Sequence, residues 1–313
     1  MTHPLWHCRV RRGPGRLPWR AVLPALLLCV GASAADAPKR MNAIDVVARS
    51  APADWRAVDP ENTLYLELAS GRVVIELAPQ FAPLHVKNLK ALVREKYFDG
   101  MPIVRVQDDY VTEWEDKDEP ERPIRTALTS LEPEFTGPIR PGQQFIRLPD
   151  GDVYAPEVGF SDGYPVARDP KAGTRWIAHC YGMLGLGRGD DPKSGFGGSP
   201  FVVLGHTRNL DRNDTLLGHV VHGIELLSSL PRGPAPRGFF EKREQMTPIL
   251  RIRIAADVPA AERTEVEVMK VDTPTFQRYV EARRSPPDAW FVQPAGKTDV
   301  CHVRVPSRLK PAT

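Results

Sequence analysis

Two alternating apolar runs around a short turn constrain the fold of this chain more than any other feature. They lie in TLYLELASGRVVIELA, residues 63–78. Every second residue on each side of the turn is apolar: Leu64, Leu66 and Leu68, then Val73, Ile75 and Leu77. A period of two places these side chains on one face of each strand, and Ser70-Gly71 supplies the tight turn. The sequence therefore predicts a β-hairpin with one buried face.

After residue 82 the period of the pattern changes to that of a helix. Pro83 stands at a first-turn position, where its missing N–H costs nothing. Apolar residues then follow at spacings of three and four: Val86, Leu89, Val93 and Tyr97. This spacing is typical of an amphipathic helix packed on a core. Asp99-Gly100 ends the helix, and a short strand at 103–106 follows that carries one arginine, Arg105.

The rest of the chain shows shorter patterns. They predict strands at 201–204, 216–221, 249–255, 265–269 and around Cys301, and helices at 43–48, 224–230 and 274–284. Thr273 is the expected N-cap of the last helix, with Pro274 at its first position. Residues 117–175 have no clear period; short candidate strands are QQFIRL within this range and WIAHCYG (176–182) directly after it. We interpret 117–175 as a long inserted loop region and not as a separate domain.

The first residues have the composition of a secretory signal peptide. Five arginines precede any acidic residue: Arg9, Arg11, Arg12, Arg16 and Arg20. The apolar run 21–34 follows, and Ala32-Ser33-Ala34 has the small-x-small form of a cleavage site. The run is short for a membrane span and contains Pro24. We therefore expect cleavage near Ala34 and a mature chain that is periplasmic or secreted and has no membrane span. A mitochondrial transit peptide is the minor alternative.

Removal of this leader changes the charge of the protein. The chain has 42 Lys and Arg against 39 Asp and Glu, a net charge of +3. Without the five leader arginines the balance is 37 against 39, a net charge of −2. The basic excess therefore belongs to the leader, and binding to nucleic acid loses its electrostatic support.

Cysteine and histidine positions bear on bridges and metals. Cys8 and Cys29 lie in the leader, which leaves Cys180 and Cys301. An exported protein with two cysteines permits one disulfide between them, and two separate buried thiols are the alternative.

His219 and His222 fall where strand alternation directs their rings to opposite faces. We expect two surface histidines there and no metal site.

The order of these elements and several phrases resemble the cyclophilins, a family of peptidyl-prolyl cis-trans isomerases. APLHVKNLKAL (82–92) resembles the family's first helix, and YFDGMPIVRV (97–106) its YYDG-x-x-F-H-R-V. GMLGLGRG (182–189) resembles G-x-L-S-M-A-N. The stretch 197–227, which begins GGSPFVV, resembles GSQFFI…LDG…VFGKVVEGM. The likeness covers residues 62–116 and 182–256.

The resemblance implies a mainly β fold, a closed eight-stranded antiparallel barrel capped by two helices. In this chain the barrel would carry the inserted region and a C-terminal extension. The expected organisation is a signal peptide at 1–34, an N-terminal segment at 35–61, a cyclophilin-like domain at 62–256 with the insertion at 117–175, and the extension at 257–313.

The resemblance also assigns a site. Arg105 falls on the family's catalytic arginine. The positions implied to bind substrate are Tyr110, Val111, Glu113, Gly187, Arg188, Val202, Leu210 and Asp214. Among them Val202 stands for a pocket phenylalanine and Leu210 for a pocket leucine, whereas the assignments of Asp214 and Asn209 involve a one-residue gap near 205–209. Five positions depart from the family: Glu113 replaces a glutamine, Glu115 a glycine and Pro200 a glutamine, Asp214 stands where a histidine often lies, and Asn209 lies near the place of a tryptophan.

The implied activity is isomerisation of X–Pro bonds in exported proteins as they fold. It needs no cofactor, nucleophile or metal, because rotation about the amide breaks no covalent bond. The expected partners are proline-containing peptides or unfolded protein clients, and we expect a monomer. The alternative is a catalytically weak or inactive cyclophilin-like module that binds peptides as a chaperone. The Glu113 carboxylate is the feature that separates the two, because it can either position Arg105 or occupy its donors.

Overall fold

A computed structural model describes residues 40–116 and 122–311 of the chain. The leader predicted at 1–34 lies outside these residues. Residues from Arg40 onward form one compact unit. Within the described ranges, no helix has the length and apolar character needed to cross a bilayer.

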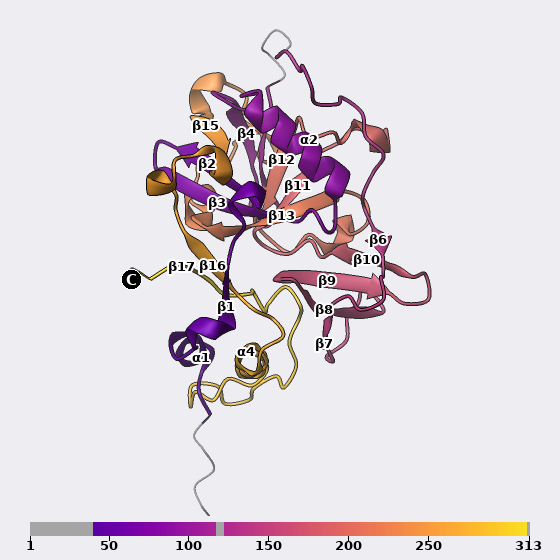
Figure 1. The fold of residues 1–313 in the computed structure, drawn as a ribbon, viewed down its shortest axis with the longest axis vertical. Coiled ribbons are helices and arrows are strands. Elements are labelled where there is room, and N and C mark those ends of the chain that lie inside the picture. The colour runs from indigo at the N-terminus through magenta and orange to yellow at the C-terminus, as the bar shows by residue number, and fades with distance from the viewer. Residues whose placement is uncertain (1–39, 117–121, 312–313) are drawn as a thin grey trace, which may run out of the picture. The chain divides into compact units, whose positions relative to one another are not determined.

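A nine-stranded antiparallel sheet forms the larger part of the unit (Figure 1). The strand order is β14-β4-β5-β12-β11-β13-β3-β2-β15. The strands are β2 (Thr63–Leu68), β3 (Gly71–Leu77), β4 (Pro102–Val106), β5 (Val111–Trp114), β11 (Met183–Leu186), β12 (Pro200–Val203), β13 (Thr215–His222), β14 (Thr247–Pro248) and β15 (Arg251–Ile254). The predicted hairpin is confirmed as β2 and β3, which pair from Thr63 opposite Glu76 to Leu68 opposite Gly71.

The two edges of this sheet are formed by neighbouring pieces of chain. β14 pairs with β4, whereas β15, only two residues further on, pairs with β2. Between them, Ile249 N donates to Met101 O at 2.9 Å and Leu250 N donates to Glu67 O at 2.8 Å. The stretch 247–254 therefore pairs with β4 at one end of the strand order and with β2 at the other. Because this stretch is divided into β14 and β15, the curled sheet has nine strands. The closed eight-stranded barrel is not confirmed and stays a prediction.

Two helices pack on this sheet as expected. α2 (Pro83–Arg94) buries Val86, Leu89, Leu92 and Val93 in the core beneath it, and it ends three residues before Tyr97. α3 (Ile224–Ser228) follows β13 and buries Leu227. Gly223, which lies between β13 and α3, has a φ of 81°, and a Cβ at this position would lie 2.6 Å from Arg72 O. Only glycine accommodates both the left-handed backbone and this approach.

The inserted region forms a sheet of its own, which corrects the interpretation of 117–175 as mainly loop. Its five strands are ordered β6-β10-β9-β8-β7. They are β6 (Gly137–Pro138), β7 (Ile146–Leu148), β8 (Glu157–Ser161), β9 (Tyr164–Asp169) and β10 (Thr174–Ile177). β8 and β9 form a hairpin around Asp162-Gly163, both with positive φ. The candidate strands in QQFIRL and WIAHCYG are confirmed as β7 and β10.

The two ends of the unit meet in a third sheet, ordered β1-β16-β17. Its strands are β1 (Trp55–Ala57), β16 (Val266–Met269) and β17 (Ser307–Leu309). The helices α1 (Ala43–Ala48) and α4 (Pro274–Arg284) lie beside it, at the end of the unit away from α2 (Figure 1). Thr273 Oγ1 accepts a hydrogen bond from Phe276 N at 3.1 Å, so the predicted N-cap is confirmed. The strand expected around Cys301 is wrong, because Cys301 lies in a turn.

A second apolar core joins the inserted sheet to this C-terminal extension. Phe160 of β8 packs edge to face on Phe276 of α4, with ring centroids 5.1 Å apart. In the same core, Cys180 and Cys301 form a disulfide between residues 121 positions apart. The extension is therefore integrated with the domain through packing and through a covalent bond.

The expectation of two surface histidines on β13 is wrong for His219. Its side chain is buried, its Nε2 lies 3.0 Å from Glu76 Oε2, and its ring lies 4.4 Å from that of Tyr164. The insertion strand β9 supplies Tyr164 and so covers the face of β13 on which His219 lies. In the described part of the chain, no group of His, Cys, Asp and Glu could hold a metal ion.

Candidate functional site

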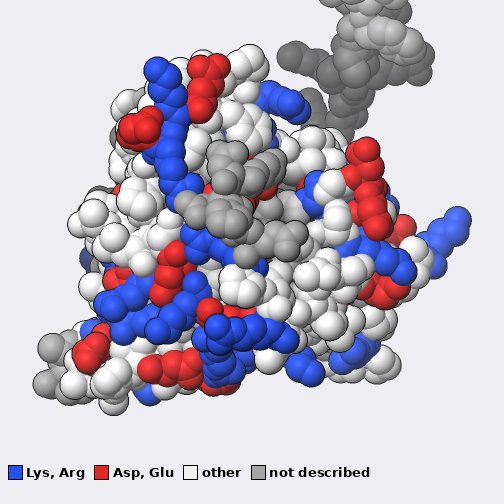
Figure 2. Space-filling view, turned by 90° about the horizontal axis from the view of Figure 1, so that it is seen from above, with Lys and Arg blue, Asp and Glu red and all other residues white. Residues whose placement is uncertain are grey.

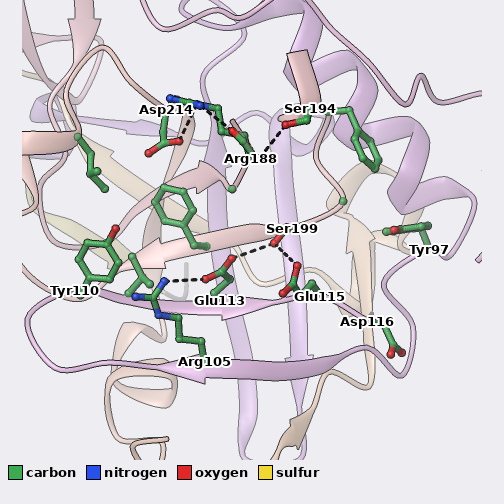
Figure 3. Close-up of a pocket in the computed structure, with 17 residues that line it drawn as sticks. Tyr97, Arg105, Tyr110, Glu113, Glu115, Asp116, Arg188, Ser194, Ser199 and Asp214 are labelled. Atoms are coloured by element: carbon green, nitrogen blue, oxygen red, sulfur yellow. Dashed lines mark hydrogen bonds and ion pairs between the residues drawn. The ribbon is translucent and has the colours of Figure 1, made fainter. Parts of the chain in front are cut away.

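One cavity of about 530 Å³ opens between β4, β5, β12 and the loops that follow β11 and β12 (Figure 3). Eight of the nine site residues expected from the sequence line it: Arg105, Tyr110, Val111, Glu113, Gly187, Arg188, Leu210 and Asp214. They come from segments up to about a hundred residues apart in the sequence, and strand pairing brings them together. The ninth, Val202, does not line the cavity.

Strand register places three of the lining residues in one row. Arg105 of β4 lies opposite Glu113 of β5, and Glu113 lies opposite Phe201 of β12. Side chains that face one another across neighbouring strands lie on the same side of the sheet. The cationic, acidic and aromatic side chains therefore meet along one wall.

Partners on several sides hold the Arg105 guanidinium in place. Its Nε donates to Arg237 O at 2.7 Å and its Nη2 to Gln107 Oε1 at 2.6 Å. The rings of Tyr110 and Phe239 lie 4.7 and 4.8 Å from its central carbon, a cation–π distance. The third nitrogen, Nη1, is 3.4 Å from Glu113 Oε2. The Arg105 side chain keeps 13% of its surface exposed, so it is fixed at the edge of the cavity without being sealed from it.

Glu113 belongs to a short chain of polar contacts that runs away from Arg105 (Figure 3). The Ser199 hydroxyl lies 3.1 Å from Glu113 Oε1 and 3.1 Å from Glu115 Oε2. A hydroxyl has one proton, so it donates to one of these carboxylates at a time. Burial, and then the negative charge of Glu115, raise the pKa of Glu113. Its contact with Arg105, at 3.4 Å, is long for an ion pair and does not offset these effects.

The aromatic wall of the cavity is Phe201, and this corrects the assignment of Val202. Val202 is fully buried in the core beneath α2, whereas Phe201 lines the cavity. Successive residues of a strand face opposite sides, so an error of one position moves a side chain from the pocket to the core.

A glycine on the neighbouring strand makes room for this ring. Gly185 of β11 lies opposite Phe201, and a Cβ at 185 would lie 2.3 Å from Phe201 Cζ. Real Cβ atoms do not approach so closely, so any side chain at 185 would displace the ring. The sequence shows Gly185, but only the pairing of β11 with β12 gives it this role.

Arg188 and Asp214 form the opposite border of the cavity. Arg188 Nε donates to Asn213 O at 2.8 Å and lies 3.7 Å from Asp214 Oδ1. Burial raises the pKa of Asp214. Because the Arg188 guanidinium also donates to Gly189 O, it ties the loop after β11 to the turn before β13. These contacts define the width of the opening.

Sequence reasoning missed the segment 235–240, which lies against Arg105. Phe239 bridges to Arg105, Phe240 N donates to Val104 O at 2.9 Å, and Arg237 supplies the carbonyl for Arg105 Nε. The proline-rich sequence PRGPAPRG (231–238) indicates only that regular secondary structure is interrupted there. The signal that could have revealed its role is the aromatic pair Phe239-Phe240 directly after it.

Charge on the outer surface gives no sign of a nucleic-acid partner on the face seen in Figure 2. Lys and Arg side chains lie next to Asp and Glu side chains across that face. A nucleic-acid interface requires a basic stripe with few acidic residues. The cavity, by contrast, combines the charged side chains of Arg105 and Arg188 with the apolar lining of Tyr110, Val111, Phe201 and Leu210, which suits a ligand that is apolar at one end and polar at the other.

The curled antiparallel sheet with a helix over its core is the cyclophilin fold. A solved cyclophilin from Hirschia baltica, AquaCyp293, has this architecture: it aligns with a TM-score of 0.66 and 27% identity over 82% of this chain and 94% of that one. The likeness extends beyond residues 62–256 into the additional segments.

The family model described as cyclophilin type peptidyl-prolyl cis-trans isomerase/CLD matches residues 63–255. The chain belongs to this family of enzymes. A probable peptidyl-prolyl cis-trans isomerase of Brucella suis is 28% identical over 178 residues, which are 56% of this chain and 75% of that protein. A putative thylakoid lumen peptidyl-prolyl cis-trans isomerase of Synechocystis is 24% identical over 58% of this chain and 49% of its own length.

Proposed function

We propose that this protein isomerises X–Pro bonds in exported proteins while they fold, with Arg105 as its catalytic residue. The observation that carries the proposal is the position of the Arg105 guanidinium, fixed at the lip of a cavity that is also lined by apolar side chains. Membership of the family gives the reaction class. The residue roles and the clients are our own inference.

A fixed guanidinium suits this reaction because rotation about a peptide bond requires no covalent chemistry. The barrier is about 18–20 kcal/mol, since the amide nitrogen shares its lone pair with the carbonyl. Twisting ends this sharing and leaves a more basic nitrogen. A donor that is already oriented toward the twisted amide stabilises it more than either planar form, which lowers the barrier. Arginine stays charged at any physiological pH and presents its donors in a rigid fork.

The apolar wall provides the second requirement, a grip on the proline ring. We assign this role to Tyr110, Val111, Phe201 and Leu210, which line the cavity together. Burying the ring against them holds one side of the X–Pro bond while the other side turns. Gly187 and Arg188, on the loop after β11, are proposed to contact the residues before the proline.

Three observations support an exported location. The leader has the charge pattern and cleavage site of a signal peptide. The Cys180–Cys301 bridge is of the kind that persists in oxidising compartments. One relative is named for the thylakoid lumen. We propose that the mature protein is periplasmic or secreted and that its substrates are proline-containing segments of unfolded clients.

The test compares Arg105→Ala with the unaltered chain by NMR exchange spectroscopy on an Ala-Pro peptide. Removing a preorganised donor typically costs on the order of 10²- to 10³-fold in turnover, so we expect Arg105→Ala to fall to near the uncatalysed rate. Arg251→Ala, an exposed arginine on β15, is the matched control and should keep full activity. Equal exchange rates for Arg105→Ala and the unaltered protein would contradict the assignment.

The same experiment also tests the alternative function, which is a module that binds peptide without catalysing its isomerisation. If the unaltered protein shifts the peptide resonances but gives no exchange above background, the pocket binds and does not catalyse. Exchange that depends on Arg105 removes that alternative.

A further inference from the structure

Three consecutive apolar side chains project from the C-terminal extension, far along the chain from the catalytic cavity. In the loop after α4, Trp290 is 82% exposed, Phe291 is 40% exposed and Val292 is 98% exposed. The rings of Trp290 and Phe291 contact each other edge to face, 4.9 Å apart. Isolated exposed apolar residues are common on proteins, but a contiguous run with a tryptophan marks an interaction surface.

A second element extends this apolar surface. Ile44 of α1 is 80% exposed, and it lines a cavity of about 750 Å³ together with Phe291. We call the surface formed by Ile44, Trp290, Phe291 and Val292 the tail face. It lies at the end of the unit that carries α1 and α4, away from α2 (Figure 1).

Basic and acidic side chains both line the two cavities at the tail face, and the basic ones are more numerous, with Glu281 as the acidic residue of the adjoining pocket. Arg283 and Lys297 line the same cavity as Phe291, and Arg40 lines the adjoining pocket beside α4. Lys297 is exposed, and it has no ion pair with a described residue. The acidic residues of the cavity are Asp288 and Asp299, and Arg284 is already paired with Asp150. Burial, followed by the positive charge of Arg283, lowers the pKa of His302 on the same cavity.

The chain that precedes the described residues emerges at the same place. Arg40, the first described residue, and Met41 line the pocket between α1 and α4. The apolar run 21–34 ends six residues before Arg40.

These features fit a lipid surface better than a peptide. A peptide-binding site holds apolar side chains in a groove. Ile44 and Phe291 line a cavity, but Trp290 and Val292 do not line it and have most of their surface exposed. Tryptophan beside lysine and arginine is the composition of segments that lie at the boundary between headgroups and acyl chains. Basic side chains near the surface add attraction to anionic lipids.

We propose that the tail face docks the protein on an anionic membrane surface, with Trp290, Phe291 and Val292 at the acyl boundary and Arg40, Arg283 and Lys297 against the phosphates. Binding of this kind is peripheral and needs no membrane-spanning helix. It would hold the catalytic cavity close to the membrane at which exported chains emerge. The docking itself does not depend on the proposed isomerase role.

The test is cosedimentation of residues 35–313, which contain the whole compact unit, with vesicles of phosphatidylethanolamine and phosphatidylglycerol. Vesicles of phosphatidylcholine alone are the uncharged comparison. We expect binding to the anionic vesicles that weakens with salt, and at least a tenfold weaker partition for the double variant Trp290→Asp/Val292→Asp. Lys297→Glu should also weaken binding. The peptide exchange rate in solution should stay unchanged in both variants.

Two matched controls lie on the inserted region. Val153 is 90% exposed but stands outside the tail face, and Lys171 is an exposed lysine in the β9–β10 turn. Val153→Asp and Lys171→Glu should leave vesicle binding intact. No binding to anionic vesicles, or equal binding by the tail-face variants, overturns the proposal. If the tail-face variants instead lose capture of a permanently unfolded polypeptide while vesicle binding is absent, the face is a client site and the lipid proposal is wrong.

Discussion

Among single residues, Glu113 has the strongest influence on what Arg105 can do. Its carboxyl lies 3.4 Å from Arg105 Nη1, the nitrogen of the guanidinium that is not bound to Gln107 or Arg237. A negatively charged Glu113 attracts that nitrogen and competes with a substrate for it. A neutral Glu113 does not compete in this way. Because burial and Glu115 raise the pKa of Glu113, its neutral form persists to higher pH than for an ordinary glutamate.

We therefore predict that Glu113→Gln raises kcat/KM by about fivefold at neutral pH, equivalent to about 1 kcal/mol in the activation free energy. The unaltered enzyme should lose activity as pH rises through the raised pKa of Glu113, because the carboxyl becomes charged there. Glu113→Gln should lack this decline. The measurement is a pH profile of peptide exchange for both proteins.

Asp214 needs a parallel control, because burial raises its pKa too and it lines the same cavity. Asp214→Asn should keep the decline with rising pH if Glu113 causes it. A Glu113→Gln variant that is less active at every pH would show the opposite role, in which the carboxylate positions Arg105.

At this scale the sequence identified most of the site but not its exact residues. Arg105 could be placed because it lies within the phrase YFDGMPIVRV, and Tyr110 follows five residues later. Phe201 was missed because PFVVL is apolar at every position. The sequence therefore shows no alternation of polar and apolar residues that would indicate which side chains of the strand face the pocket. Pairing with Glu113 on one side and Gly185 on the other settles the register.

Among the elements, β11 carries a requirement that its sequence does not reveal. Gly185 leaves the space that the Phe201 ring occupies. We predict that Gly185→Ala displaces the ring and lowers kcat/KM by on the order of tenfold or more, because small misplacements of a binding group are costly. Overpacking should also reduce stability by about 1–3 kcal/mol. Peptide exchange and urea unfolding measure the two effects.

Gly189→Ala is the matched control for that substitution. Gly189 also lines the cavity, but a Cβ there meets its nearest neighbour, Ser194 Oγ, at an ordinary 3.5 Å. Its activity should stay close to that of the unaltered enzyme. Full activity in Gly185→Ala would mean that the ring tolerates displacement and that Phe201 is not a binding wall.

The inserted sheet shows where prediction from a single sequence ends. β8 and β9 are buried on both faces, so their side chains lack the polar alternation of a half-exposed strand. Their second partner is the extension, through contacts such as Phe160 with Phe276, 116 positions apart. α4, in contrast, was predictable because its cap and its first proline are adjacent in the sequence.

For the whole molecule, the Cys180–Cys301 bridge connects the domain to its extension. We predict that Cys180→Ala/Cys301→Ala lowers the free energy of unfolding by about 2–5 kcal/mol, because the bridge closes a long loop in the unfolded chain. The kcat/KM should change little, since neither sulfur lines the cavity. Urea unfolding of the unaltered protein with and without a thiol reductant is the control and should give the same difference. A loss of activity without a loss of stability would contradict this division of roles.

Acid should destabilise the whole molecule through carboxylates that are buried among cations. Burial disfavours the charged forms of Glu76 and Asp211. The contacts of Glu76 with His219 and Arg56, and those of Asp211 with His179 and Arg208, outweigh this effect and lower both pKa values. A lowered pKa contributes stability that is present above the ordinary pKa of about 4. That stability is lost as pH falls through the folded value.

We therefore predict that unfolding free energy declines steeply below about pH 4, where the unfolded chain binds more protons than the folded one. Glu113, whose pKa is raised, has the opposite effect on the free energy of unfolding, because its stabilising contribution is lost as pH rises. Asp211→Asn should cost about 3–5 kcal/mol at neutral pH, since it leaves the buried Arg208 with one carboxylate fewer. It should also flatten the acid dependence, because one of the protons taken up on unfolding is removed. The exposed Asp190→Asn should change neither quantity. Urea unfolding across pH measures both, and an undiminished acid slope in Asp211→Asn would show that this carboxylate does not drive acid unfolding.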